Sequence, residues 1–504
     1  MRRGLVLNLI SNIAFFVAGY AIHWFLGGFA SPADYGVVGT IITVLDFEYL
    51  FVSNGARQSL SRNIASHRHD GRQVIVRTLA VQASIVAVFF LIDFAGAPLF
   101  GLMLGDGTLD RYFRYAAFLV PANGLYVVML GINDGLQRFG RSAFLSTFYP
   151  IVKLGTIPLI VLVFPREPVI GVEVGYCGAM VLTILIGLAM LVPARSLLPD
   201  GDGTPFPWRD AMHGTLSFSL FFIMASLVLS VDTLVVKAEL PDRMAGYYTG
   251  AMNFGKTTYY LLQAFAVIIL PVVSRLIAED ARGEALAKAR GLFLLVFALV
   301  APIAATISAT APDLLAAFYS PAYATAAPAL SCLAFSSFFM GVTVILNMTL
   351  NAERDTRFSD LLSLVSLAVV VPLFVASARY GITALAVSSM AATFTAMAVS
   401  YVEVRRRFGD VMSRRAWAAI GCDAVLWIVM AVVSRTTFHV TDFVALMVVY
   451  AVVYGAFVAV LVRIGVLDVR GIAAMFAKRT EDADGSATGG TATRKTIAKE
   501  KDGD

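Results

Sequence analysis

Charged side chains are scarce in this chain of 504 residues: Asp, Glu, Lys and Arg make up 14% of it, and hydrophobic residues 58%. Soluble domains carry about 25% charged residues, so the composition excludes an ordinary soluble domain. The formal net charge of +5 does not indicate a nucleic-acid partner. We therefore expect an integral membrane protein that binds no nucleic acid.

Cysteine and histidine are also few. The three cysteines, Cys177, Cys332 and Cys422, lie in separate apolar segments without metal-ligand spacing, and they are typical of small core residues. The five histidines show no metal-like clustering. The sequence has no nucleophile elbow and no metalloprotease motif. We expect no metal, no cofactor and no enzymatic activity.

Long apolar runs fill most of the chain instead. Each spans about 20 residues, the length that a helix needs to cross a bilayer. Barrel strands alternate in hydropathy over about ten residues, whereas these runs are longer and uniformly apolar. The sequence therefore predicts an all-α polytopic membrane protein with about 14 transmembrane helices. The expected spans are near 4–29, 36–56, 75–98, 112–133, 142–164, 169–193, 213–239, 245–272, 290–310, 326–350, 359–378, 381–403, 416–434 and 441–463.

Arginine and lysine in the loops predict the orientation. They gather in one alternate set of loops, for example at Arg68 and Arg72 after span 2 and at Arg405, Arg406 and Arg407 after span 12. Loops rich in Lys and Arg remain in the cytoplasm. Because the number of spans is even, both termini are expected to be cytoplasmic.

A stretch rich in Pro, Gly and Asp, PARSLLPDGDGTPFPWRD, separates the first six spans from the rest and has the composition of a linker. The polar, low-complexity C-terminal end is expected to be disordered. The predicted parts are an N-terminal lobe (1–193), a cytoplasmic linker (194–211), a C-terminal lobe (212–404), spans 13 and 14 (405–464) and a mostly disordered cytoplasmic tail (465–504).

An internal repeat relates the two lobes. An offset of 210 residues aligns Gly36 with Gly246 and Asp46 with Lys256. Repeated halves with a site between them at mid-membrane are typical of secondary transporters. We therefore expect two six-helix lobes related by the repeat, followed by two further helices.

Two lysines lie near the centres of apolar runs: Lys153 in SAFLSTFYPIVKLGTIPLIVLVF and Lys256 in GYYTGAMNFGKTTYYLLQAFAVIILP. A cation at mid-bilayer costs about 2.5–3.5 kcal/mol on insertion scales, so it usually faces a protein interior or a wet cavity. Further charges that lie within or at the ends of the spans are Asp46, Glu48, Arg57, Asp134 and Asp232. They predict a cavity for an anionic substrate, with carboxylates that hold the cations when the site is empty. The alternative is that each charge belongs to a buried pair that joins helices.

The segment GAMNFGKT at 250–257 matches the phosphate-binding loop pattern G-x-x-x-x-G-K-[ST]. That loop needs a preceding strand and an α/β domain, whereas this one lies within a membrane span. We therefore exclude ATP binding. Energy would come from the substrate gradient or from an ion gradient, with Na⁺ or H⁺ as the coupling ion.

The chain resembles the polysaccharide-transport flippases, of the type that serves O-antigen and exopolysaccharide synthesis. The resemblance lies in VDTLVVKAELPDRMAGYYTGAMNF (231–254) with LPVVSRLIAE (270–279), and in SPADYGVVGTIITVL (31–45) with SNGARQSLSRNIA (53–65). These proteins belong to the multidrug/oligosaccharidyl-lipid/polysaccharide exporter superfamily, with the multidrug antiporters and the lipid II flippases.

The resemblance implies a V-shaped bundle of two lobes around a cationic cavity, with spans 13 and 14 outside the lobes. It implies alternating access and the transfer of undecaprenyl-diphosphate-linked sugar units across the bacterial inner membrane, with a glycan polymerase and a chain-length regulator as candidate partners. By position it makes Arg57, Lys153 and Lys256 the substrate-binding cations. Asp46 and Asp232 become their partners or gates, and Glu48 and Asp134 are further candidate partners.

Several alternatives remain open. One is a major-facilitator exporter, although its Gly-x-x-x-Asp-Arg-type loop after span 2 is not present, and another is a scaffold or receptor role, which inert cavity charges would favour. A cation-coupled drug or metabolite antiporter of the same superfamily would have a cavity dominated by acidic residues, which Lys153 and Lys256 disfavour. A membrane-embedded glycan polymerase or ligase would need a sizeable outward domain, whereas the predicted outward loops, such as 99–111 and 311–325, are short.

Overall fold

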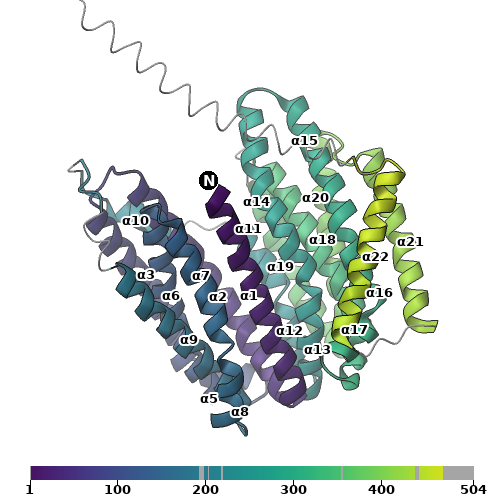
Figure 1. Cartoon of the computed structure of the whole chain (residues 1–504), viewed down its shortest axis with the longest axis horizontal. Coiled ribbons are helices and arrows are strands. Elements are labelled where there is room, and N and C mark those ends of the chain that lie inside the picture. The colour runs from purple at the N-terminus through teal and green to yellow at the C-terminus, as the bar shows by residue number, and fades with distance from the viewer. Residues whose placement is uncertain are drawn as a thin grey trace, which may run out of the picture.

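The computed structural model describes residues 2–191, 198–202, 204–216, 220–352, 356–436 and 442–468, and helices dominate these ranges (Figure 1). Eleven helices in the described part are long and apolar enough to cross a membrane. Three further helical segments, at 2–29, 220–239 and 242–278, lie where other spans were predicted. The all-α polytopic fold is therefore confirmed.

The N-terminal lobe is built around one long helix, α2, which packs against α6 and α3. Ser31 caps this helix by accepting a hydrogen bond from the Asp34 N–H at 3.1 Å, and Pro32 starts its first turn. Helix α1 packs against α7, and α9 covers α6 and α7. The helices of this lobe are α1 (Arg2–Phe29), α2 (Pro32–Ala65), α3 (Gly71–Ala95), α4 (Ala97–Met103), α5 (Leu109–Ala116), α6 (Leu119–Gly135), α7 (Phe139–Lys153), α8 (Thr156–Val163) and α9 (Pro168–Leu191).

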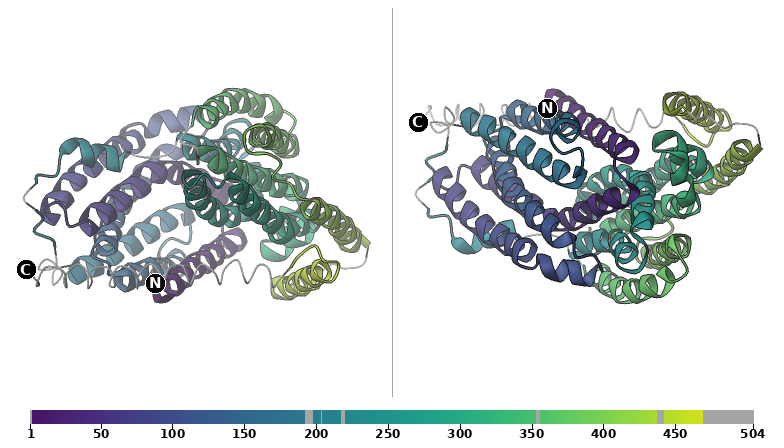
Figure 2. Two further views of the ribbon diagram at one scale, coloured as in Figure 1. Left: turned by 90° about the horizontal axis from the view of Figure 1, so that it is seen from above. Right: turned by 90° about the horizontal axis from the view of Figure 1, so that it is seen from below.

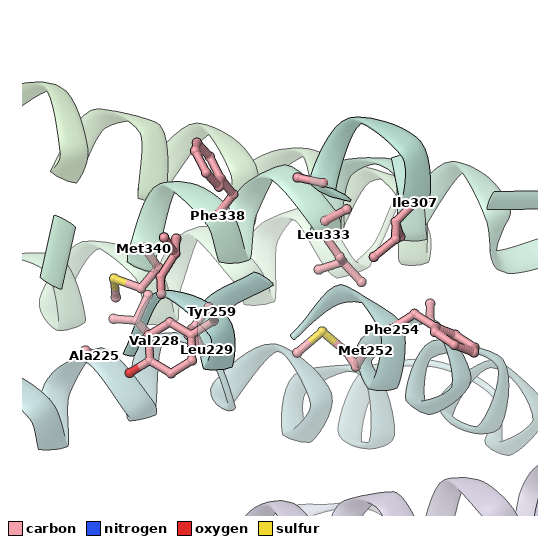
Figure 3. Close-up of a cluster of buried hydrophobic side chains, with 14 of the residues drawn as sticks. Ala225, Val228, Leu229, Met252, Phe254, Tyr259, Ile307, Leu333, Phe338 and Met340 are labelled. Atoms are coloured by element: carbon pink, nitrogen blue, oxygen red, sulfur yellow. The ribbon is translucent and has the colours of Figure 1, made fainter. Parts of the chain in front are cut away.

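The C-terminal lobe is centred on α18 (Ala327–Asn351), which packs against α20, α14, α13 and α16. Figure 3 shows its core, where apolar side chains of α11, α13, α14, α16 and α18 form one cluster. The other helices of this lobe are α11 (Leu220–Val228), α12 (Val231–Glu239), α13 (Asp242–Gly255), α14 (Thr257–Ala278), α15 (Arg282–Leu295), the π-helix η2 (Val296–Val300), α16 (Ala301–Ala309), α17 (Ala311–Phe318), the 3-10 helix η3 (Pro321–Ala326), α19 (Arg357–Ala378) and α20 (Ile382–Phe408).

The last two spans, α21 (Arg414–Thr436) and α22 (Phe443–Arg463), pack against α16 and η2. Figure 2 shows them at the edge of the C-terminal lobe that is remote from the N-terminal lobe. They therefore lie outside the two lobes.

The predicted linker contains a short helix, α10 (Trp208–Thr215), which packs against α2 and α3. Upstream of it, the Gly71 N–H donates a hydrogen bond to the carbonyl oxygen of Pro199 at 2.8 Å. We call the end of the bundle that holds α10 and the start of α15 the linker side (top of Figure 1), and the opposite end the far side. Residues 192–197 and 203 of the linker region, and 469–504 of the predicted tail, lie outside the described residues.

The lobes meet through α2, which packs against α11, α12 and α13. In Figure 1 the helices of the two lobes converge at the far side and lean apart toward the linker side, which gives the bundle a V shape. The glycines that the repeat aligns are in direct contact here: a Cβ on Gly36 would lie 2.7 Å from the Gly246 nitrogen. A Cβ on Gly246 would lie 1.7 Å from the Pro32 carbonyl oxygen. Only glycine allows the two backbones to approach this closely.

Candidate functional site

The two mid-span lysines lie where their helices are interrupted. Lys153 ends α7 and is followed by a turn before α8 begins at Thr156. Lys256 separates α13 from α14, and its N–H still donates to the Met252 carbonyl at 2.9 Å. Each lies about 21 Å along its span from the start of α7 or α13, at the 1.5 Å rise of a helix. Both ammonium groups therefore originate near the middle of a hydrocarbon core about 30 Å thick.

Asp46 lies within electrostatic range of both lysines. It lies on α2 at the corresponding height and its side chain is exposed. It interacts electrostatically with Lys256 and with Lys153. Since Lys153 belongs to the N-terminal lobe and Lys256 to the C-terminal lobe, the cluster spans the junction of the lobes. We refer to Asp46, Lys153 and Lys256 as the central cluster, which carries two potential positive charges and one negative.

Aromatic rings surround one of its cations. The Lys153 Nζ lies 3.5 Å from the centroid of the Tyr176 ring and 5.9 Å from that of Tyr149. Cations within about 6 Å of a ring face are attracted by its quadrupole. The sequence analysis missed both tyrosines. Tyr149 could have been found from its i,i+4 spacing to Lys153 on one helix, whereas Tyr176 lies on α9, whose register against α7 no sequence pattern gives.

Arg57 lies apart from the central cluster. Its Nε donates to Asp134 Oδ2 at 2.8 Å, which joins α2 to α6 on the linker side. Arg57 comes eleven residues after Asp46 on the same helix, a separation of about 16 Å. Its side chain remains 41% exposed, so the charge is accessible despite the ion pair. The predicted cation Arg57 and the predicted carboxylate Asp134 thus form a pair of their own.

Asp232 is a buried group that joins helices. Its Oδ2 accepts a hydrogen bond from the Tyr248 hydroxyl at 2.8 Å, and its Oδ1 accepts one from the Thr233 N–H at 2.7 Å. These contacts connect α12 to α13, and Asp232 is 1% exposed. It also interacts electrostatically with Lys256, so it contributes to the field at the central cluster without sharing its accessibility.

The structure does not bring Glu48 to the lysines. Its carboxyl group faces that of Asp93 on α3, and both residues are buried. Glu48 follows Asp46 by two residues, which turns its side chain about 200° around the helix, away from the cluster. Glu48 Oε2 and both oxygens of Asp93 have no hydrogen-bond donor within the described residues. The expected charge partner of the lysines is therefore half of an acidic pair inside the N-terminal lobe.

On the far side, an ion-paired lysine joins the lobes. Lys237 Nζ at the end of α12 lies 2.6 Å from Asp106 Oδ2, in the loop between α4 and α5, and 2.6 Å from Asp242 Oδ1. Burial alone would raise the pKa of Asp106, but hydrogen bonds from Lys237 and Thr108 outweigh it and hold that pKa below its usual value.

Hydrogen-bonded tyrosines connect the lobes nearby. The Tyr35 hydroxyl lies 2.8 Å from His23 Nδ1 and 3.0 Å from the Tyr319 hydroxyl, which also accepts a hydrogen bond from Asn253 at 3.1 Å. His23 and Tyr35 belong to the N-terminal lobe, and the other two residues to the C-terminal lobe. The lobes are thus held together at the far side by contacts that no sequence pattern predicts.

The two-lobed helical bundle is similar to the folds of solved transporters. "Lipid II flippase MurJ, inward closed conformation" matches with a TM-score of 0.68 and 13% identity, over 92% of this chain and 99% of that one. An inward-facing multidrug resistance MATE family transporter of the MOP superfamily matches with a TM-score of 0.61 and 16% identity, over 81% and 98%. At these identities the likeness establishes a common fold.

The family follows from the sequence. The family model described as "Polysaccharide biosynthesis protein" matches residues 25–328. The chain therefore belongs to the family of polysaccharide biosynthesis proteins, and the expected resemblance is confirmed. No curated protein matches the sequence.

Proposed function

We propose that this protein is a flippase that moves undecaprenyl-diphosphate-linked oligosaccharide units across the bacterial inner membrane. The product would serve O-antigen, capsule or exopolysaccharide synthesis, with a glycan polymerase and a chain-length regulator as partners. Both termini, and with them the linker side, would lie in the cytoplasm. The observation that carries the proposal is the central cluster: Lys153 and Lys256, from opposite lobes, both interact electrostatically with the exposed Asp46.

The chemistry of the cluster suits a diphosphate. When the site is empty, Asp46 partly balances the two ammonium groups. A diphosphate carries several acceptor oxygens and more negative charge than one carboxylate, so it would displace Asp46 from both lysines. Because the lysines belong to different lobes, one bound diphosphate would connect the lobes at mid-membrane.

That connection supplies a mechanism of alternating access. The lobes lean apart at the linker side and are joined at the far side by Lys237, Asp106 and the tyrosine contacts. Substrate would enter from the linker side, draw Lys153 and Lys256 together and stabilise closure there. Opening at the far side would then require the Lys237–Asp106 contact to break. A Na⁺ or H⁺ gradient could drive the cycle in one direction.

The main alternative, a drug or metabolite antiporter, is compatible with the fold, since a MATE transporter shares it. The cluster disfavours it, because two lysines face one accessible carboxylate and would repel an organic cation. A glycan polymerase or ligase finds less support, since the far-side segments described, such as 104–108, are short.

Binding of the lipid carrier tests the proposal. The purified chain in lipid nanodiscs is titrated with undecaprenyl diphosphate and with uncharged undecaprenol. We expect the diphosphate to bind at least tenfold more tightly, and Lys153→Ala and Lys256→Ala each to remove most of that difference. Arg379→Ala, which deletes an exposed cation at the end of α19, should change nothing.

The same variants can be compared in cells that lack their own glycan flippase. A chain that restores the surface glycan should lose this ability with Lys153→Ala or Lys256→Ala at unchanged abundance, and keep it with Arg379→Ala. Equal affinity of the wild type for undecaprenol and its diphosphate would contradict the proposal.

A further inference from the structure

The side chain of Lys153 occupies a site that has the chemistry of a cation receptor. The Tyr176 ring lies beneath its ammonium group at 3.5 Å, Tyr149 lies at 5.9 Å, and Asp46 supplies a negative charge. We call Tyr149, Tyr176 and Asp46 the cation seat. Its members come from α7, α9 and α2, so the seat belongs entirely to the N-terminal lobe.

Aromatic faces together with a carboxylate are the groups by which proteins recognise ammonium and quaternary ammonium ligands. The groups that hold the Lys153 ammonium would therefore also attract an organic cation. Whether Lys153 or a free cation occupies the seat depends on the effective concentration of each. The Lys153 ammonium group is tethered beside the seat, so its effective concentration there is high. A free cation must displace this lysine and then meet its positive charge nearby.

We propose that Lys153 sets the charge selectivity of the cavity by occupying a latent organic-cation site. The ammonium group of Lys153 fills the seat, and Lys256 remains accessible to an anion. Removing Lys153 frees the ring faces of Tyr149 and Tyr176 beside the exposed Asp46, and the seat then accepts a small alkylammonium ion. This role of Lys153 goes beyond the proposed flippase function and does not depend on which anion is carried.

Lys256 provides the matched comparison. It interacts with the same Asp46, but none of the cation–π contacts within the described residues involves it. Deleting Lys256 changes the net charge by the same amount as deleting Lys153 and leaves the seat filled. If the seat accounts for cation binding, the variant that lacks Lys153 must therefore gain it and the variant that lacks Lys256 must not.

The experiment measures binding of n-propylammonium to the purified full-length chain in nanodiscs by saturation-transfer NMR. This ion carries the three carbons and the ammonium group that Lys153→Ala removes. We expect Lys153→Ala and Lys153→Met to bind it at least tenfold more tightly than the wild type and Lys256→Ala. Adding Tyr176→Leu to Lys153→Ala should abolish the gain, whereas adding Tyr176→Phe, which keeps the aromatic face, should retain it.

Two results would overturn the proposal: equal binding by Lys153→Ala and Lys256→Ala, or a gain that survives Tyr176→Leu. Only variants that elute as the wild type does and melt cooperatively are compared, and the two substitutions at Lys153 guard against one failing to fold. Since no glycan lipid is present, the outcome is separate from that of the flippase proposal, which depends on diphosphate binding by the wild type.

Discussion

The interiors of the two lobes differ in their polar chemistry. In the N-terminal lobe three carboxyl groups, Glu48, Asp93 and Glu173, are buried and have oxygens without a hydrogen-bond donor in the described chain. In the C-terminal lobe the buried polar groups are mainly hydroxyls and amides that bond to one another across helices. For example, Ser336 and Ser389 lie 2.9 Å apart, between α18 and α20.

This difference indicates that the buried polar groups of the two lobes have different roles. Neutral hydroxyl pairs in a bundle of small residues hold α18 and α20 in one arrangement and demand little of their surroundings. A buried carboxyl group without a donor is costly when it is ionised. The residues described between 220 and 408 contain no such carboxyl group, so these groups distinguish the N-terminal lobe.

The positions that the internal repeat aligns extend the comparison of the two lobes. Where the lobes touch, the aligned positions both carry glycine, Gly36 and Gly246. At mid-membrane the aligned positions carry opposite charges, Asp46 and Lys256. The contact between the lobes thus needs the same residue from each, whereas the central cluster takes residues of opposite charge from these aligned positions.

The largest expected effect is at the contact between the lobes. Gly246→Val places a Cβ about where the Pro32 carbonyl oxygen lies, 1.7 Å away, and backbone cannot move aside as a side chain can. We expect a loss of roughly 4–5 kcal/mol or more, seen as absent or aggregated protein. The same substitution at Gly455, whose Cβ would meet nothing within 4 Å, should leave the yield and the melting temperature of the purified chain unchanged. A normally folded Gly246→Val variant would show that the lobes do not meet as described.

A second expectation concerns the sign of the stability change that a substitution inside each lobe produces. Glu48→Gln replaces one of two facing carboxyl groups with an amide that can donate to Asp93, and it should stabilise the chain by roughly 1–2 kcal/mol. Ser389→Ala removes a satisfied hydroxyl from the C-terminal lobe and should destabilise it by about 1 kcal/mol. Thermal unfolding of both variants beside the wild type checks the pair. If both variants shift the melting temperature in the same direction, the polar chemistry of the two interiors does not differ as proposed.

Much of the fold was predictable from the sequence because hydropathy alone marks where a helix must cross a bilayer. The two mid-span lysines were also predictable, since a cation in an apolar run has a known cost. What sequence could not give was the rotation and register of helices against one another. Tyr176 contacts Lys153 from another helix, and Asp134 pairs with Arg57 across 77 positions of the chain. Glu48 was assigned to the lysines although the helical repeat turns it away from Asp46.

The smallest effect is expected where the lobes join at the far side. The pKa of Asp106 is held below its usual value, so the folded chain keeps this carboxylate charged at a pH where the unfolded chain protonates it. Its contribution to stability is therefore fully present above the usual pKa of aspartate, and is lost as the pH falls through the lower, folded value.

The thermal midpoint of the wild type should thus fall more steeply than that of Asp106→Asn between about pH 6 and pH 3, and the two should converge at the acid end. Asp110→Asn is the control, because Asp110 pairs with Arg114 on the same exposed helix and connects no lobes. Parallel curves of thermal midpoint against pH for the wild type and Asp106→Asn would show that the Lys237–Asp106 contact does not help to hold the far side together. A difference confined to Asp106→Asn would assign this part of the acid sensitivity of the folded chain to the contact between the lobes.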